Sequence, residues 1–291
     1  MKKITSAKII YPPQKKLGQN FLFKESYLQK IATAFPLDPN TIIIEIGSGY
    51  GNLTNLLAQT NCQKVISLEK DPQLFQWLTE KNTPAKYSCN SKENKILFLH
   101  QDALKVDWLT FGQEWKGNSL VVVGNLPYYL ANSLIVELLL NGSLFKALVL
   151  LVQKEVAQKW VASPLKYNHH YSALSVFINY LAHTEITLVV PAGDFVPVPS
   201  VDGALVKIEP YSFNLTSTKL TAFLTFLKKC FHFRRKTLLN NLNSFPSSEK
   251  REWTQYFQQK NYSLLLRPQN LTPEEYWDLF LFSENSKDIR Y

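Results

Sequence analysis

The chain has 291 residues, of which 45% are hydrophobic and 19% charged, a balance typical of a globular protein with one large domain and a smaller one. Its formal net charge of +9 favours a polyanionic partner such as nucleic acid, because lysine and arginine contacts to phosphates supply sequence-independent affinity. It lacks an apolar run of about 18 residues and a secretory signal, so we expect a cytoplasmic protein that is neither membrane-embedded nor exported.

The first elements along the chain are a short basic arm and a nucleotide-binding turn. Lys15 and Lys16 precede the segment LGQNFL at 17–22. The apolar run from Thr41 to Ile44 predicts a strand over 41–46, and EIGSGYGNLT at 45–54 is typical of the first βα turn of a nucleotide-binding sheet. A tight turn without any ligand is the alternative for a single glycine loop.

The glycine loop favours S-adenosylmethionine over a dinucleotide. Its glycines stand at 47, 49 and 51, which differs from the GxGxxG spacing that seats a pyrophosphate. Glu45 just before the loop would repel a diphosphate, whereas a cofactor with a sulfonium and an amino group gains from negative charge nearby. We therefore predict Glu45, Gly47 and Gly49 to be cofactor-binding residues.

Acids follow the next two predicted strands. The strand over 64–69 ends in Glu69, at the distance from the loop expected for a ligand of the ribose hydroxyls. The strand over 96–99 is followed by Asp102, which can accept a hydrogen bond from the adenine amino group. Either acid alone can be a solvated residue at a strand end. Together with Glu45 and Asn125 they occupy the carboxyl ends of successive strands, where open α/β sheets bind ligands.

The strand over 119–124 runs into Asn125-Leu126-Pro127-Tyr128, which suits an exocyclic amine on a planar base. Pro127 lacks an N–H and restrains Leu126 to an extended conformation, so the Asn125 side-chain oxygen and the Leu126 carbonyl can present two acceptors side by side. Tyr128 can stack on the base. A capped turn with a core tyrosine is the alternative.

Three further strands are predicted near 147–152, 186–190 and 204–208, the last two as an antiparallel pair at one edge. The proline-rich segment 191–200 between them carries Phe195. This ring can pack on the target base opposite Tyr128, or it can simply be buried in a stiff crossover. Helical patterns between the first five strands predict a mostly parallel sheet covered on both faces.

The C-terminal region is predicted to be all helical, with helices over about 217–243, 247–260 and 272–282. The first carries a basic stripe of Lys228, Lys229, His232, Arg235 and Lys236, which can contact phosphates or remain a solvated face. Arg234 falls on the apolar side of the same helix, which indicates a break near Phe233 or a specific partner for its guanidinium.

Cysteine and histidine show no pattern of a bound metal. Cys62, Cys89 and Cys230 are scattered, and the five histidines do not complete a ligand set with them. We predict neither a disulfide nor a metal.

Seven motifs spread along the chain resemble the ribosomal RNA adenine N6,N6-dimethyltransferases, the family tied to kasugamycin sensitivity. They are LGQNFL at 17–22, EIGSGYGNLT at 45–54, LEKD at 68–71, QDAL at 101–104, GNLPYYL at 124–130, FVPVPSVDGALV at 195–206 and FRRKTLLNNL at 233–242.

The resemblance implies a fold, a site and a substrate. It implies a Rossmann-like, seven-stranded methyltransferase sheet with a small all-α C-terminal domain. The cofactor contacts implied are Asn20, Leu22, Gly47, Glu69, Asp102 and Asn125. The substrate implied is a pair of adjacent adenosines in the last hairpin of small-subunit rRNA. We expect an arm that covers the cofactor at 1–23, a methyltransferase domain at 24–210 and a helical RNA-binding domain at 211–291.

Several alternatives stay open. Arg267-Pro268-Gln269 departs from the family pattern, which leaves C-terminal packing or RNA contacts in doubt. A large-subunit rRNA adenine methylase and a DNA adenine methylase share the cofactor motifs. An assembly factor that binds immature small subunits without methylating them is a further possibility, against which Gly47, Asn125 and Tyr128 argue. We expect a monomer that acts on rRNA within a partly assembled subunit.

Overall fold

The computed structural model describes residues 11–81, 95–127, 129–164, 169–243 and 250–288, so Tyr128 and Cys89 lie outside the described residues. The chain divides into two compact units, one of residues 1–157 with 183–212 and one of residues 158–182 with 213–291. The segment 158–182, which we assigned to the methyltransferase domain, groups with the C-terminal helices. The predicted boundaries at 23/24 and 210/211 remain predictions.

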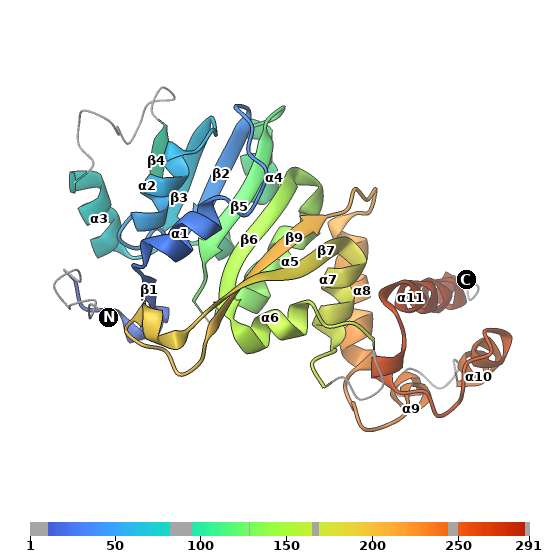
Figure 1. The fold of residues 1–291 in the computed structure, drawn as a ribbon. Helices are drawn as coiled ribbons and strands as arrows, with labels where there is room; N and C mark the ends of the chain where they lie inside the picture. Colours follow the sequence, from blue (N-terminus) through green and yellow to red (C-terminus); the bar gives the residue numbers. More distant parts are fainter. Residues whose placement is uncertain (1–10, 82–94, 128, 165–168, 244–249, 289–291) are drawn as a thin grey trace. The chain divides into compact units, whose positions relative to one another are not determined.

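The first unit contains the predicted seven-stranded sheet (Figure 1). Its strands are β2 (Thr41–Ile46), β3 (Lys64–Glu69), β4 (Ile96–His100), β5 (Ser119–Asn125), β6 (Phe145–Gln153), β7 (Ala182–Val190) and β9 (Gly203–Pro210). They lie in the order β4-β3-β2-β5-β6-β9-β7. The neighbouring strands β4 and β3, β3 and β2, β2 and β5, and β5 and β6 run parallel to each other. β9 runs antiparallel to β6. The predicted pairing of the last two strands at one edge is confirmed.

Helices cover both faces of this sheet, which explains why its central strands are continuous apolar runs. β2 and β3 are buried along their whole length. α1 (Glu25–Ala32), α2 (Asn52–Gln59) and α3 (Pro72–Lys81) bury Leu28, Leu57 and Leu78 in one core with Val65 and Val121. α4 (Trp108–Glu114) and α5 (Ala131–Leu140) lie behind the sheet in Figure 1.

A second, two-stranded sheet ties the N-terminal segment to the insertion between β7 and β9. β1 (Phe21–Leu22) pairs antiparallel with β8 (Phe195–Val196), so that Leu22 lies opposite Phe195. Strands of two residues are too short to be predicted from the hydrophobic periodicity of the sequence. The pairing brings a segment from the start of the chain to the edge of the sheet that carries the predicted site.

The described part of the second unit is helical, as predicted. Besides α6 (Lys154–Trp160), which spans the boundary, its helices are α7 (Ala173–Leu181), α8 (Ser217–Cys230), α9 (Leu238–Leu242), α10 (Lys250–Gln259) and α11 (Pro273–Asp288). α11 begins as predicted, because the Thr272 hydroxyl accepts from the Glu275 N–H and the Glu275 carboxylate accepts from the Thr272 N–H. No helix among the described residues has the length and apolar character needed to cross a membrane.

The prediction of one helix over 217–243 is wrong, because the chain leaves the helix at Phe231 and re-enters it at Leu238. Buried Asn241 stabilises the intervening turn: its Oδ1 accepts from Phe233 N, and its Nδ2 donates to the Phe233 and Thr237 carbonyls. Thr237 caps the second helix. The predicted stripe is therefore not a single helix face: Lys228 and Lys229 lie on α8, and the other three residues are exposed in the turn.

Arg234 lies in this turn, and both suggestions made for it are confirmed. The helix breaks around it, and its guanidinium donates to the carbonyl of Tyr171 at 2.8 Å. Tyr171 is buried and donates its own hydroxyl to the carbonyl of Leu271 at 2.9 Å. These bonds connect the segment before α7 to the turns around α9 and α11 within the second unit.

Candidate functional site

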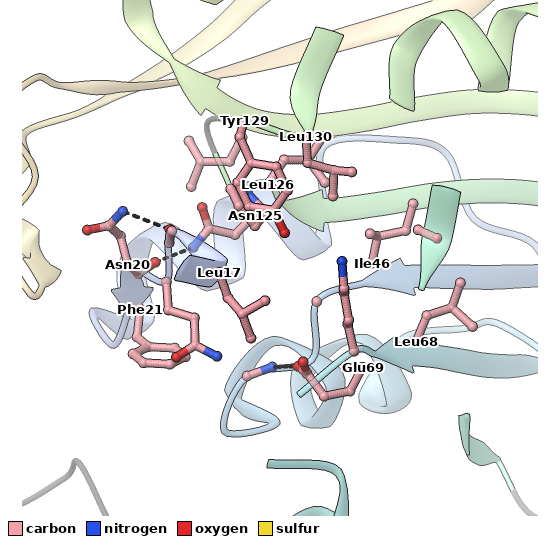
Figure 2. Close-up of a pocket in the computed structure, with 18 of the residues that line it drawn as sticks. Leu17, Asn20, Phe21, Ile46, Leu68, Glu69, Asn125, Leu126, Tyr129 and Leu130 are labelled. Atoms are coloured by element: carbon pink, nitrogen blue, oxygen red, sulfur yellow. Dashed lines mark hydrogen bonds between the residues drawn. The ribbon is translucent and has the colours of Figure 1, made fainter. Parts of the chain in front are cut away.

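A pocket lies at the carboxyl ends of β2 to β5, where open α/β sheets bind ligands. Together with its mouth, which is open to solvent, it encloses about 900 Å³ of space between the side chains. Figure 2 shows Asn125, Tyr129 and Leu130 on one side, Leu68 and Glu69 on another, and Asn20 and Phe21 at one end. Most of the predicted site residues line it: Asn20, Gly47, Gly49, Glu69, Asp102, Asn125, Leu126, Pro127 and Phe195.

The glycine loop and Glu69 form one wall of the pocket. Gly49 has a φ of +55°, and its N–H donates to Glu69 Oε2 at 2.9 Å. A Cβ at Gly49 would lie 3.1 Å from the Phe21 ring, so only glycine combines this backbone with so close an approach of the N-terminal segment. Glu69 Oε1 accepts from the backbone N–H of Asp71 at 2.8 Å. Burial raises the pKa of Glu69, and the hydrogen bonds from the Asp71 and Gly49 N–H groups lower it. The effect of burial is the larger, so the pKa lies above its usual value.

Asp102 is on the next strand end and carries a negative charge. Its Oδ1 accepts from the Leu104 N–H at 3.1 Å, and its Oδ2 pairs with Lys70 Nζ at 2.9 Å. Burial raises the pKa of Asp102, but the Lys70 and Leu104 contacts outweigh burial and leave the pKa below its usual range. The pocket wall thus carries two carboxylates and one ammonium, which disfavours a polyphosphate ligand.

The Asn125 side chain has a defined orientation. Its Nδ2 donates to the backbone carbonyl of Asn20 at 2.9 Å, which leaves Oδ1 as the acceptor that the amide can offer to a ligand (Figure 2). Leu126 donates its N–H to the carbonyl of Leu151 at 2.9 Å. This bond fixes the turn against β6. Among the described residues, none donates a hydrogen bond to the Leu126 carbonyl. The pair of acceptors therefore stays a prediction, and Tyr128 lies outside the described residues.

Phe195 lines the same pocket but is only 4% exposed. It is held by the β1–β8 pairing and by the Val196–Pro197 segment, which contains a cis peptide bond. The ring is therefore buried in the crossover and still forms part of the pocket wall, whereas its packing on the target base opposite Tyr128 stays a prediction.

Glu45 lies deeper than predicted. It is 1% exposed, and its Oε2 accepts hydrogen bonds from the Thr54 and Ser67 hydroxyls. It does not line the main pocket; with Leu22 it lines a smaller cavity that shares Phe21, Gly47, Gly49 and Asn125 with the main one. Glu45 Oε1 has no hydrogen-bond partner among the described residues. A role for Glu45 or Leu22 at the cofactor remains a prediction.

The buried Glu45 carboxyl gives the protein a predictable pH dependence. Burial raises the pKa of Glu45 to about 7, although the Ser67 and Thr54 hydroxyls lower it. The folded protein therefore binds this proton more tightly than the unfolded chain, and the associated stability is complete below about pH 4.5 and lost as the pH rises through about 7.

We expect the unfolding free energy of wild type to decrease relative to that of Glu45→Gln by up to about 3 kcal/mol between roughly pH 5 and 8. Urea denaturation of the two proteins at several pH values measures this difference. Glutamine retains an acceptor for both hydroxyls, so the comparison isolates the charge. Parallel pH profiles would contradict the prediction.

Several residues in and around the pocket had no individual role predicted from the sequence. Gln101 and Tyr129 line it, and Tyr129 is 52% exposed at its mouth. Asp71 Oδ2 accepts from the side-chain amides of Gln14 at 3.0 Å and Gln19 at 2.8 Å. These contacts hold the N-terminal segment against the end of β3. Only their positions within motifs hinted at a role, for Gln19 in LGQNFL, Asp71 in LEKD, Gln101 in QDAL and Tyr129 in GNLPYYL.

Known proteins resemble this chain over most of its length. The family model described as ribosomal RNA adenine dimethylase matches residues 13–281. A protein of Caldanaerobacter subterraneus named ribosomal RNA small subunit methyltransferase A is 37% identical over 239 residues, covering 81% of this chain and 85% of the relative. A protein of the same name from Natranaerobius thermophilus is 31% identical over 284 residues, which cover 92% of this chain and 90% of the relative.

Two solved structures share the fold. A dimethyladenosine transferase from Plasmodium falciparum matches with a TM-score of 0.71 and 23% identity over 92% of this chain and 98% of that chain. The 23S rRNA methyltransferase ErmE matches with a TM-score of 0.65 and 24% identity over 90% of this chain and 99% of that chain. These likenesses confirm the predicted methyltransferase fold. At such identities they do not distinguish between substrates.

Proposed function

The chain belongs to the ribosomal RNA adenine dimethylase family, and we propose that it transfers methyl groups from S-adenosylmethionine to N6 of two adjacent adenosines in the 3′-terminal hairpin loop of 16S rRNA. The product is N6,N6-dimethyladenosine at both positions. We also propose that the enzyme is a monomer, acts in the cytoplasm and needs no metal. Its substrate would be rRNA in a partly assembled small subunit, so that methylation is a step in the biogenesis of that subunit.

The observation that carries this proposal is the Asn125 amide, whose Nδ2 is held by the Asn20 carbonyl. Oδ1 and the Leu126 carbonyl can then accept the two hydrogens of an adenine amino group. The N6 lone pair is delocalised into the ring, so these acceptors favour a more tetrahedral and nucleophilic nitrogen as positive charge develops. Each transfer would form the bond from N6 to the methyl carbon, break the carbon–sulfur bond to release S-adenosylhomocysteine, and end with loss of one N6 proton to solvent. One hydrogen then remains on N6 after the first transfer, so a second transfer needs only one acceptor.

The remaining pocket residues suit the proposed methyl donor. Bound S-adenosylmethionine supplies an electrophilic methyl group on a sulfonium. Glu69 would accept the ribose hydroxyls, Asp102 would accept the adenine amino group, and Gly47 would leave room for the backbone to approach the ligand. The buried Glu45 carboxyl, whose Oε1 is unpartnered among the described residues and whose pKa is raised to about 7, would add negative charge beside the same loop when it is ionised. A cationic cofactor gains from this charge, whereas a diphosphate would be repelled.

Exposed basic residues of the second unit supply the proposed contact with rRNA. Lys228, Lys229, Arg235 and Lys236 are all exposed on α8 and the turn that follows it. Such residues bind phosphates with an affinity that decreases as salt increases. The target adenosine must also leave its stack, which costs a few kcal/mol and least in a loop. A hairpin loop is therefore an accessible substrate.

The proposal is tested by methyl transfer to small subunits from a strain that lacks this protein. Mass spectrometry of the 3′-terminal rRNA fragment should show two dimethyladenosines after incubation with the enzyme and cofactor. Modification of large-subunit rRNA or of duplex DNA instead would overturn the substrate assignment. Binding of small subunits without any binding of S-adenosylmethionine in calorimetric titration would support an assembly factor that does not methylate.

A further inference from the structure

A series of hydrogen bonds connects Glu69 to Asn125 through the N-terminal segment. The Asp71 N–H donates to Glu69 Oε1 at 2.8 Å, and Asp71 Oδ2 accepts from Gln19 Nε2 at 2.8 Å. The residue after Gln19 is Asn20, whose carbonyl accepts from Asn125 Nδ2 at 2.9 Å. One end of the series is the proposed ligand of the ribose, and the other is the proposed acceptor of the target amine.

Burial and reciprocal bonding stiffen this series. Glu69 and Asp71 are 6% and 3% exposed, so their hydrogen bonds to charged oxygens are worth more than bonds at the surface. Gln19 uses both ends of its amide, because its Oε1 accepts from the Gln14 N–H at 2.8 Å while its Nε2 donates to Asp71. The orientation of the Gln19 side chain is thereby fixed, and with it the backbone that leads into Asn20.

The N-terminal segment also packs directly on the turn that carries the proposed target site. A Cβ built on Gly18 would lie 3.4 Å from Pro127 Cβ and 3.5 Å from Tyr129 Cδ1. A shift of residues 18–20 would therefore change both the packing of this turn and the partner of the Asn125 amide. Without that partner the amide can turn its Nδ2 toward an incoming amine, which is the unproductive orientation.

We propose that Gln19 and Asp71 are positioning residues that couple occupation of the ribose site at Glu69 to the orientation of the Asn125 amide. A ligand on Glu69 orders the Glu69–Asp71 pair, Asp71 holds Gln19, and Asn20 then holds the amide with Oδ1 toward the target. This inference rests on the proposed function and adds to it an order of events, in which the methyl donor prepares the site for the adenine.

The first test compares Gln19→Ala with Gln14→Ala. Both remove a side-chain amide from the same oxygen of Asp71. Gln14→Ala keeps the backbone N–H that orients Gln19, so it serves as the matched control. At saturating cofactor and RNA, kcat of Gln19→Ala should decrease by a factor within the roughly 5- to 150-fold range of site-to-site coupling, with KM for RNA near the wild-type value. Gln14→Ala should retain kcat within about threefold of wild type.

A second variant, Asp71→Asn, tests the same connection with less risk that the protein fails to fold. Asp71→Asn retains an acceptor for the Gln73 N–H at the start of α3 but replaces the carboxylate that binds Gln19. Its kcat should decrease as in Gln19→Ala, and the double variant should be no worse than either single one, because all three break the same connection. Wild-type kcat in Gln19→Ala, or defects that add in the double variant, would overturn the proposal.

The side-chain amide of Asn125 gives a readout that does not depend on activity. Its signals in a nitrogen-15 spectrum are identified by their loss in Asn125→Ala. Adding S-adenosylhomocysteine should slow hydrogen exchange of this amide in wild type and leave it unchanged in Gln19→Ala. Equal slowing in both proteins would overturn the coupling. A wild-type protein that methylates no RNA would instead overturn the proposed function, while the exchange measurement still decides the coupling.

Discussion

Asn125→Ala is expected to lower kcat for methyl transfer to small-subunit rRNA by roughly 10²–10³-fold, the range measured when a single preorganised polar group is removed from a reaction centre. Alanine removes the acceptor that Asn125 Oδ1 offers to the amine. It also removes the donor that binds Asn20 at 2.9 Å. Because the side chain is only partly buried, the fold should be retained. Single-turnover methyl transfer at saturating cofactor measures the effect.

A matched substitution separates the two functions of this amide. Asn125→Asp keeps an acceptor for the amine but has no donor for the Asn20 carbonyl, so its rate should fall between those of wild type and Asn125→Ala. Thermal melting checks that each variant is folded, and calorimetry with S-adenosylhomocysteine checks the cofactor site. Wild-type turnover in Asn125→Ala would remove this residue from the mechanism.

The parts of the site that the sequence predicted all depend on local order along the chain. Apolar runs locate the strands, and the residue that follows each run must lie at the carboxyl end of a parallel sheet. This reasoning placed Glu69, Asp102 and Asn125 at one pocket, where the structure has them. It could not tell whether a carboxylate near the end of a strand opens to the pocket or is buried below it. Glu45 lies within β2, so its side chain is buried beside Ser67 and faces the smaller cavity.

The contacts that the sequence could not predict join residues far apart in the chain. Gln19 and Asp71 are separated by 52 positions, and although they lie in the motifs LGQNFL and LEKD, neither motif indicates that the two side chains meet. The turn after α8 was predicted only as a possible break near Phe233 within one helix, for a different reason. It contains neither glycine nor proline, and it is stabilised by the side chain of Asn241, eight positions after Phe233. Helical periodicity of the leucines on both sides predicted one continuous helix, and only the position of Arg234 on its apolar side indicated the break.

Glu69→Gln is expected to weaken binding of S-adenosylhomocysteine by roughly 100-fold or more, because hydrogen bonds to a charged group contribute about 1.5–3 kcal/mol each. In wild type both carboxylate oxygens accept backbone N–H groups, from Gly49 at 2.9 Å and from Asp71 at 2.8 Å. Glutamine must turn its amino group toward one of these donors. The substitution therefore disturbs the glycine loop as well as the proposed ribose contact.

A deoxyribose analogue of the cofactor product separates these two effects. If Glu69 binds the ribose hydroxyls, wild type should lose affinity when the ligand lacks a hydroxyl, and Glu69→Gln should lose little more. Calorimetric titration of both proteins with both ligands closes a double-mutant cycle, and its coupling term is the interaction of Glu69 with that hydroxyl. Equal losses in the two proteins would place the ribose elsewhere. Glu69 would then act only by holding Gly49 and Asp71, a role that still links the loop to the N-terminal segment.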